Sequence, residues 1–342
     1  FEPWELKTKG GGTPYRVYTP FQKACLALPP PAPPLSIPAE MKGTDKLPAA
    51  VSIDSLELNP KIDWAKGFNS VWAPGAAGAK KELGRFIKQG VESYQDGRNL
   101  PAEIGTSRLS PYLHFGEISV RTVWQQLLKV PSCQSLTTYR AELIWREFAY
   151  HLLFHYPDTP TKPLRTEFEK FPWRTDELLL TAWQKGLTGY PMVDAGMREL
   201  WQTGWMHNRV RMVVASFLVK HLLVPWQDGA RWFWDTLVDA DLASNTLGWQ
   251  WTAGCGADAA PFFRIFNPVT QGEKFDPVGS YVKRWCSELE KLPPKWIHSP
   301  WLAPAHVLAE ARVSLGKDYP MPIVDHSEAR AAALEAYEEL KE

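Results

Sequence analysis

The chain has 342 residues, with 38 Lys or Arg against 38 Asp or Glu, so its formal net charge is zero. This balance excludes binding to nucleic acid through bulk positive charge, and any such binding has to come from a local patch. The four cysteines have no paired spacing and no apolar run approaches the length of a membrane span, which predicts free thiols, no zinc site and a soluble cytoplasmic protein.

Residues 1–75 differ from the rest of the chain in their proline content and in their lack of a regular apolar period. The stretch LPPPAPPLSIPAE (Leu28–Glu40) is dense in proline, which excludes a helix and favours an extended strap over a surface. The residues before this stretch show no core of their own. We therefore predict that 1–75 is the remnant of an interdomain linker whose upstream domain is absent from this chain.

From Ala76 onward, apolar residues recur every three or four positions, as on amphipathic helices, and no strand-like alternation is visible. Residues 76–342 are therefore predicted to form one all-α domain without internal repeats. The expected helices cover residues 83–94, 116–129, 141–156, 193–204, 207–223, 230–246, 279–292 and 327–341.

The stretch GTSRLSPYLHFG (residues 105–116) places the hydroxyls of Thr106, Ser107 and Ser110 around Arg108 at the head of an expected helix. Hydroxyls, free backbone N–H groups and a helix N-terminus together can bind a phosphate. Such residues are also ordinary helix caps, so this stretch alone leaves both interpretations open.

The stretch Asp239–Pro268 is the part of the sequence that most resembles a ligand site. Asp239 and Asp241 precede Asn245, and a run of small residues follows the two nearby tryptophans. Carboxylates near a nucleotide bind ribose hydroxyls, indoles offer stacking faces, and small residues let a flat ligand approach the backbone. A Trp-rich helix that ends in a Gly loop explains these residues alone equally well.

The expected helix 141–156 carries two further pairs of polar or aromatic side chains. Glu142 and Trp145 are three residues apart and share a helical face, which suits recognition of a base. For this pair alone, a core Trp beside a surface Glu is the simpler interpretation. His151 and His155 have metal-ligand spacing but lack the Glu of a metalloprotease motif, so we predict no metal site.

In GWMHNRVRM (residues 204–212), Asn208 and Met212 lie one helical turn apart, whereas Arg209 and Arg211 are expected to point elsewhere. An amide can read the edges of a base, a thioether adapts to apolar shapes, and an Arg pairs with phosphate. This segment therefore predicts contacts to a nucleic acid.

These stretches together resemble the cryptochrome/photolyase family, specifically the FAD-binding helical domain of class I cyclobutane pyrimidine dimer photolyases. The resemblance runs from about Tyr94 to the C-terminus, and YRVYTPFQKA is similar to the interdomain linker of the family. It implies that the antenna domain of the family is missing, so no antenna chromophore is expected here. The motifs that carry it are TSRLSPYL, ELIWREF, TGYPMVDAGMREL, TGWMHNRVRM, VDADLASNTLGWQW and APFFRIFNPVTQGEKFD.

The resemblance also implies a role for individual residues, position by position. Residues that would hold a bent FAD, with Asn245 at flavin N5, are Tyr94, Thr106, Ser107, Arg108, Leu109, Ser110, Asp239, Asp241 and Asn245. Residues that would line the cavity for the flipped-out lesion are Glu142, Trp145, Asn208, Met212 and Trp251. The electron would travel along Trp249, Trp226 and Trp173, and DNA would be contacted by Arg98, Arg209, Arg264 and Gln271.

The function implied is the light-driven repair of cyclobutane pyrimidine dimers by electron transfer from reduced FAD (FADH⁻), with damaged DNA as the partner of a monomeric deoxyribodipyrimidine photo-lyase. A blue-light-sensing cryptochrome of the same fold is the main alternative, and a flavoprotein fragment kept only for its fold or for partner binding is a third.

The resemblance also bears on the type of lesion. Enzymes for (6-4) photoproducts carry a His pair at the positions of Asn208 and Met212, because returning the transferred group needs a general acid. Neither an amide nor a thioether supplies a proton at neutral pH. The only His expected nearby is His207, which on a helix points about 100° away from Asn208. The chain is therefore expected to leave (6-4) photoproducts untouched.

Overall fold

The computed structural model describes residues 2–8, 10, 12–43, 49–58 and 61–340. These residues form helices and short helical turns without any strand, apart from one isolated bridge between Leu315 and Tyr319, so the predicted all-α class is confirmed. None of the described helices is long and apolar enough to cross a lipid bilayer.

The α-helices are α1 (Tyr18–Leu26), α2 (Ala76–Arg85), α3 (Tyr94–Gly97), α4 (Ser110–His114), α5 (Val120–Leu127), α6 (Gln134–His155), α7 (Glu177–Gln184), α8 (Pro191–Thr203), α9 (Asn208–Ser216), α10 (Trp226–Thr236), α11 (Leu242–Ala253), α12 (Pro268–Phe275), α13 (Ser280–Trp285), α14 (Ala305–Ala311) and α15 (His326–Glu339). The short turns are η1 (Ile53–Leu56), η2 (Phe68–Ser70), η3 (Phe86–Gly90), η4 (Thr166–Lys170), η5 (Phe217–His221), η6 (Ser287–Leu289) and η7 (Pro300–Leu302).

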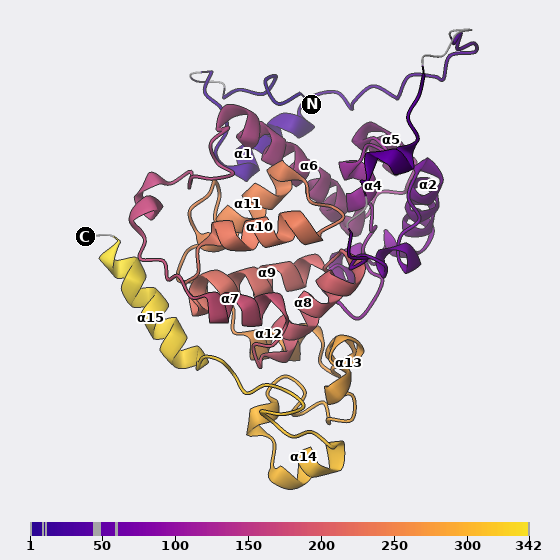
Figure 1. Cartoon of the computed structure of the whole chain (residues 1–342). Coiled ribbons are helices and arrows are strands. Elements are labelled where there is room, and N and C mark those ends of the chain that lie inside the picture. The colour runs from indigo at the N-terminus through magenta and orange to yellow at the C-terminus, as the bar shows by residue number, and fades with distance from the viewer. Residues whose placement is uncertain (1, 9, 11, 44–48, 59–60, 341–342) are drawn as a thin grey trace.

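Helices α9, α10 and α11 lie in the middle of the molecule, with α2, α4 and α5 gathered on one side and α15 on the other (Figure 1). Helix α11 packs against α6, α9 and α10. Irregular coil from the first part of the chain crosses the top of this view, and α13 and α14 lie at the bottom. This arrangement surrounds α11 with other helices.

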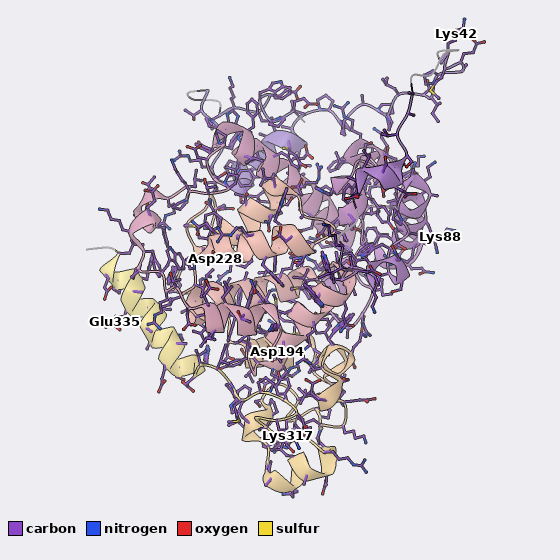
Figure 2. The ribbon with its side chains drawn as sticks, viewed as in Figure 1. Lys42, Lys88, Asp194, Asp228, Lys317 and Glu335 are labelled. Carbon is purple, nitrogen blue, oxygen red and sulfur yellow. The ribbon has the colours of Figure 1, made fainter. Side chains whose placement is uncertain are left out.

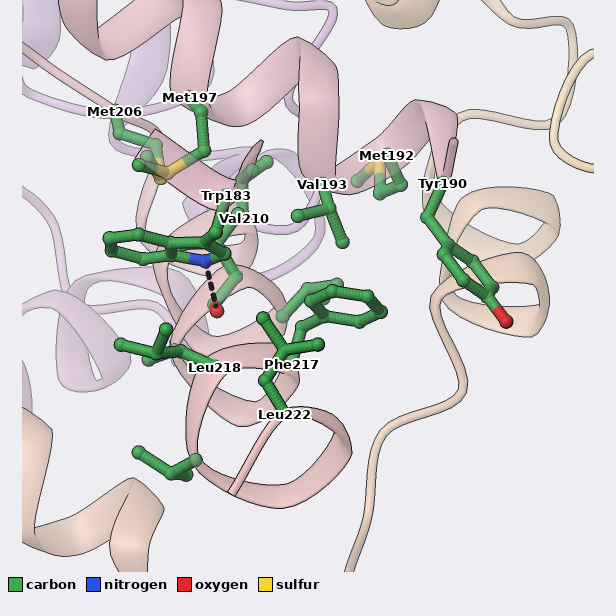
Figure 3. Close-up of a cluster of buried hydrophobic side chains, with 14 of the residues drawn as sticks. Trp183, Tyr190, Met192, Val193, Met197, Met206, Val210, Phe217, Leu218 and Leu222 are labelled. Carbon is green, nitrogen blue, oxygen red and sulfur yellow. Dashed lines mark hydrogen bonds between the residues drawn. The ribbon is translucent and has the colours of Figure 1, made fainter. Parts of the chain in front are cut away.

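The main hydrophobic core fills the space between these helices. The Trp183 indole lies in it beside Phe217 and Met206 and donates its N–H to the Val214 carbonyl at 3.0 Å (Figure 3). Asp194 is a charged side chain of this region that is fully buried, and it accepts hydrogen bonds from Thr188, Gly189 and Tyr319. In Figure 2 Asp194 lies inside the outline of the molecule, whereas Lys88 and Glu335 lie at its edge.

Two predicted helices differ from the observed ones in a way that matters for function. The expected helix 230–246 is broken at residues 237–241 into α10 and α11, because the Asp241 carboxylate accepts the Ser244 N–H at 2.7 Å and caps a new helix. The expected helix 141–156 begins earlier, at Gln134, where the Cys133 thiol caps it. Helices α7, α12 and α14 were not predicted, since they are too short to show a period.

The assignment of residues 1–75 as a linker stays a prediction, and the structure adds to it in two places. The stretch Leu28–Glu40 is indeed free of helix and exposed. The residues before it form α1, which was not predicted and whose Tyr18 and Phe21 are buried against Phe148 of α6, so this part shares a core cluster with the helical domain. Residues 1, 9, 11, 44–48 and 59–60 of the predicted linker, and residue 341 of the last predicted helix, lie outside the described residues.

Candidate cofactor and substrate cavity

A cavity of about 560 Å³ opens between helices α3, α4, α6, α9, α10 and α11. This volume lies within the usual range for ligand sites, roughly 300–1,000 Å³. The predicted site residues that line it are Tyr94, Arg98, Ser107, Leu109, Ser110, Glu142, Trp145, Asn208, Met212, Asp239, Asp241, Asn245, Trp249 and Trp251. Segments far apart in the sequence thus bring most of the predicted site together.

The break between α10 and α11 places two carboxylates on one wall of the cavity. Asp239 is nearly buried, and both of its oxygens accept hydrogen bonds from Arg211, at 2.8 and 3.0 Å. Asp241 accepts the Ser244 N–H and the hydroxyl of Tyr150. Burial and the hydrogen bond to Asp241 raise the pKa of Tyr150 to about 12, so the phenol keeps its proton and remains a donor.

Asn245 and Trp249 continue this wall along α11. The Asn245 Nδ2 donates to the Ala230 carbonyl at 3.0 Å, which leaves its amide oxygen for a ligand. Trp249 is buried, and its indole N–H has no hydrogen-bond partner among the described residues. A Cβ on Gly229 would lie 2.1 Å from the Trp249 ring, so only a glycine at that position lets α10 approach the indole this closely.

The hydroxyl-rich loop lines another part of the cavity. A Cβ on Gly105 would lie 2.3 Å from the Gly97 carbonyl oxygen, so the loop packs directly on α3. Arg85 donates to the carbonyls of Thr106 and Ser107 at 2.9 and 3.3 Å and holds the loop from behind. Ser107, Leu109 and Ser110 reach the cavity, whereas Thr106 and Arg108 do not line it.

Arg108 instead fixes the shape of this loop. Its φ of 54° is unusual for a residue with a side chain, and its guanidinium lies between the rings of Trp72 and Trp205, at 4.9 and 5.0 Å. Burial lowers the pKa of this guanidinium. The Trp205 indole N–H lies 3.4 Å from Ser110 Oγ, so the clamp is joined to the cavity wall.

The remaining predicted cavity residues form a more exposed wall. Glu142 is paired with Arg98 at 2.6 Å. One face of Trp145 is covered by the Tyr18 ring, which is stacked on it at 3.6 Å and 5°, so only the opposite face is free for a base. The same wall contains Asn208, which is exposed, and Met212 and Trp251, which are half-buried.

The predicted DNA contacts have different surroundings. Arg98 lines the cavity, but its charge is matched by Glu142. Arg209 does not line the cavity; it donates to Asn99 and lies 4.4 Å over the Phe275 ring. Arg264 is exposed and Gln271 is half-buried, and neither lines the cavity. Arg98 and Arg209 are close enough for the charge of Arg98 to lower the pKa of Arg209, and the role of all four side chains in DNA binding stays a prediction.

The three predicted electron carriers occupy different environments. Trp249 lines the cavity, Trp226 is buried at the start of α10, and Trp173 is half-buried beside Phe171. The ring neighbours of Trp249 are Phe233 at 5.0 Å and Trp183 at 6.2 Å. In the described part of the chain, no ring contact joins Trp249 to Trp226 or Trp226 to Trp173. Their order of electron transfer therefore stays a prediction.

Several cavity residues were not predicted from the sequence, and Arg211 was predicted to point the wrong way. Arg211 was expected to point away, yet it lines the cavity and binds Asp239. Its spacing of three residues from Asn208 could have revealed this. His114 also lines the cavity, so the expectation that His207 is the only nearby His was wrong. Tyr139 lines the cavity from α6 and was missed, as was Tyr150 of the same helix, which does not line the cavity but donates a hydrogen bond to Asp241.

His207 is part of the protein interior instead. It caps α9, where its Nδ1 accepts the Arg209 N–H at 3.2 Å, and its Nε2 is buried without a partner among the described residues. Burial, with Arg209 and Arg211 nearby, lowers the pKa of His207 to about 3. No group of three or more His, Cys, Asp or Glu that could hold a metal ion occurs in the ranges that the structure describes.

Comparison with known proteins shows which family the chain is similar to. A family profile described as "FAD binding domain of DNA photolyase" matches residues 139–339. The chain is 52% identical to the deoxyribodipyrimidine photo-lyase of Agrobacterium fabrum, over 99% of this chain and 72% of that protein. It is 41% identical to cryptochrome-1 of Arabidopsis thaliana, over 99% of this chain and 51% of that protein.

A solved structure is equally similar. The crystal structure of a bacterial class III photolyase from Agrobacterium tumefaciens superposes with a TM-score of 0.96 and 51% identity, covering all of this chain and 71% of that one. The present chain therefore spans about seven tenths of the photolyases and about half of the cryptochrome that it matches.

Proposed function

Since the chain belongs to the DNA photolyase and cryptochrome family, we propose that it is a deoxyribodipyrimidine photo-lyase that uses light to split cyclobutane pyrimidine dimers in DNA. The observation that carries this proposal is a single cavity with two unlike walls. One wall, called here the cofactor wall, offers the carboxylates and hydroxyls that suit a nucleotide cofactor. The other, called the substrate wall, offers Glu142, Trp145 and Trp251, with Asn208 and Met212 beside them. A cofactor and a base can therefore meet in one place.

The residues present fit FAD, the cofactor of the family. Asp239 and Asp241 can accept hydrogen bonds from hydroxyl groups, and Ser107 and Ser110 stand on a different element of the same cavity. The buried, unpartnered indole N–H of Trp249 needs an acceptor, which a bound cofactor can provide. Because the two groups face one cavity from separate elements, we propose that the cofactor is held in a bent shape.

When bound and fully reduced, FAD supplies the light-excited electron that opens the dimer. The chain itself has to take the lesion out of the duplex, and the free faces of Trp145 and Trp251 can replace the lost stacking, worth roughly 1–3 kcal/mol per base. Glu142, oriented by Arg98 at 2.6 Å, can hydrogen-bond a pyrimidine carbonyl. The indoles of Trp249, Trp226 and Trp173 are proposed to bring an electron from the surface.

We further propose that (6-4) photoproducts are not substrates. Asn208 and Met212, on the substrate wall, cannot deliver a proton. A pKa of about 3 keeps His207 neutral near pH 7, and its place inside the fold supports the proposal. His114 is the one cavity His among the described residues, and it lies on α4 with the hydroxyl-rich loop.

Several finer statements belong to this proposal. The protein is proposed to act as a monomer in the cytoplasm and to bind DNA through Arg98, Arg209, Arg264 and Gln271. The motifs predicted class I, whereas the relative described as class III covers this whole chain at 51% identity and supports class III. A blue-light sensor is the second candidate, favoured by the 41% identity to a plant cryptochrome.

Illumination of the reduced holoprotein with a dimer-containing oligonucleotide separates the two candidates. Chromatography of the digested strand should show restored thymines, and absorption spectra before and after illumination should show the cofactor unchanged by turnover. A light-dependent change in the bound cofactor without restored thymines would support the sensor.

A further inference from the structure

The segment 254–266, called here the 254–266 loop, joins an element of the proposed substrate wall to a helix that carries a proposed DNA contact. It follows α11, which carries Trp251, and precedes α12, which carries Gln271. Its tip is exposed: Phe263 is 63% exposed, and Arg264 is exposed beside it. The direction of the Arg264 side chain therefore depends on how the backbone of this loop is held.

Two side chains from the neighbouring helical segment hold the end of the loop that carries Arg264. Lys220, in η5, donates from Nζ to the Arg264 carbonyl at 2.9 Å. Ser216, one turn earlier, accepts the Phe266 N–H at its Oγ at 3.3 Å. Both side chains are buried, with Lys220 only 1% exposed. The backbone on both sides of Ile265 is thus tied to the core.

The burial of Lys220 at this contact costs desolvation free energy. Its ammonium forms no ion pair with a carboxylate in the described part of the chain, and its other favourable contact is the Phe262 ring, 5.1 Å away. Burial and the nearby Arg264 lower the pKa of Lys220 to about 7. A methionine would fill similar space without a desolvation cost, so the lysine is not explained by stability of the core.

We propose that Lys220 is a positioning residue for DNA binding, which holds the Arg264 backbone so that the Arg264 guanidinium points outward at a DNA phosphate. Below about pH 7, where Lys220 is protonated, repulsion between its ammonium and the guanidinium acts in the same direction, since it disfavours a guanidinium folded back onto the protein. This inference rests on the proposed function, because it needs DNA as the ligand.

The test is a double-mutant cycle on the FAD-loaded protein, with Lys220→Met, Arg264→Ala and the double variant. The dissociation constant of a dimer-containing duplex is measured over a range of salt concentrations. Lys220→Met should weaken binding by about tenfold, which is about 1.4 kcal/mol. It should also reduce the salt slope by about 0.9, as Arg264→Ala does, and the double variant should bind no more weakly than Arg264→Ala.

Two further readouts separate positioning from a structural role. The melting temperature of Lys220→Met should equal or exceed that of the parent, because a buried unpaired charge has been removed. Ser216→Ala, which removes the second tie, should weaken binding less than Lys220→Met. Lys317→Met is the charge-matched control, since Lys317 is exposed near α14 (Figure 2), and it should leave the dissociation constant unchanged.

The inference is overturned if Lys220→Met binds as the parent does, if it fails to fold or melts much earlier, or if its loss adds fully to that of Arg264→Ala. Failure of the proposed function looks different, since the parent itself would then neither bind nor repair the dimer-containing duplex.

Discussion

The two walls of the cavity are built on different principles. On the cofactor wall, Asp239 is nearly buried and both of its oxygens are matched by Arg211, and Asp241 is matched by Tyr150. On the substrate wall, Asn208 is exposed and Glu142 is about one third exposed in its pair with Arg98. A preorganised buried wall suits a group that stays bound, and an accessible wall suits a substrate that enters and leaves.

The largest effect is expected from a substitution of Asp239 on the cofactor wall. Asp239→Asn leaves the Arg211 charge partly buried without its counter-ion, which costs about 3 kcal/mol and should weaken FAD binding by about a hundredfold. The ratio of flavin to protein absorbance after dialysis measures this. Asp228→Asn on the surface of α10 is the control, because its Arg231 partner is exposed. Full flavin occupancy in Asp239→Asn would contradict the difference between the walls.

A second prediction concerns Glu199, which lies behind the cofactor wall and accepts hydrogen bonds from Tyr281 and the His207 N–H. Burial raises the pKa of Glu199 from 4.5 to about 7, so folding takes up a proton between these values. Its contribution to stability is complete below about pH 4.5 and is lost as the pH rises through about 7, by up to about 3 kcal/mol.

Urea unfolding of the parent and of Glu199→Gln at pH 5 and pH 8 measures this contribution. The amide cannot ionise, so the free energy of unfolding of the parent relative to the variant should fall between the two pH values. A difference that stays constant would show that Glu199 is already ionised in the folded protein at pH 5.

A third prediction concerns the route by which an electron reaches the cofactor wall. Trp226→Phe should slow photoreduction of oxidised FAD in light and thiol by at least about tenfold, while chemically reduced protein still repairs the dimer. Trp183→Phe is the informative companion, since Trp183 is the indole that touches Trp249. A larger loss in Trp183→Phe than in Trp226→Phe would replace the proposed route.

The smallest effect is expected on the substrate wall. Glu142→Gln keeps a hydrogen-bond acceptor and adds a neutral donor, so FAD occupancy should be unchanged while the yield of repair per absorbed photon falls by about threefold, a loss of under 1 kcal/mol. Loss of flavin from this variant would show that Glu142 belongs to the cofactor wall. Arg98→Ala tests the same ion pair by removal of its cation.

The sequence predicts the cavity better than the way in which it is held. Asp239, Asp241, Asn245 and Trp251 were found because carboxylates and aromatics stand close together before a small-residue run. The partners Arg211 and Tyr150 were missed, because the contacts of a side chain depend on how helices far apart in sequence pack together. No local pattern reports that packing.

Two other misses have the same origin. Helix α1 was hidden because its burial depends on α6, more than a hundred residues later in the chain, and not on its own period. Lys220 carries no sequence signal, since a single Lys in an apolar helix normally reaches solvent. Its burial and its bond to the Arg264 carbonyl are visible only in three dimensions.

The most direct measurement illuminates reduced protein with two defined oligonucleotides, one with a cyclobutane dimer and one with a (6-4) photoproduct, and separates the products by chromatography. His114→Asn is included, because His114 is the His that lines the cavity in the described part of the chain. The account predicts restored thymines from the dimer strand alone, in the parent and in His114→Asn alike. Restored bases from the (6-4) strand, or none from the dimer strand, would contradict it.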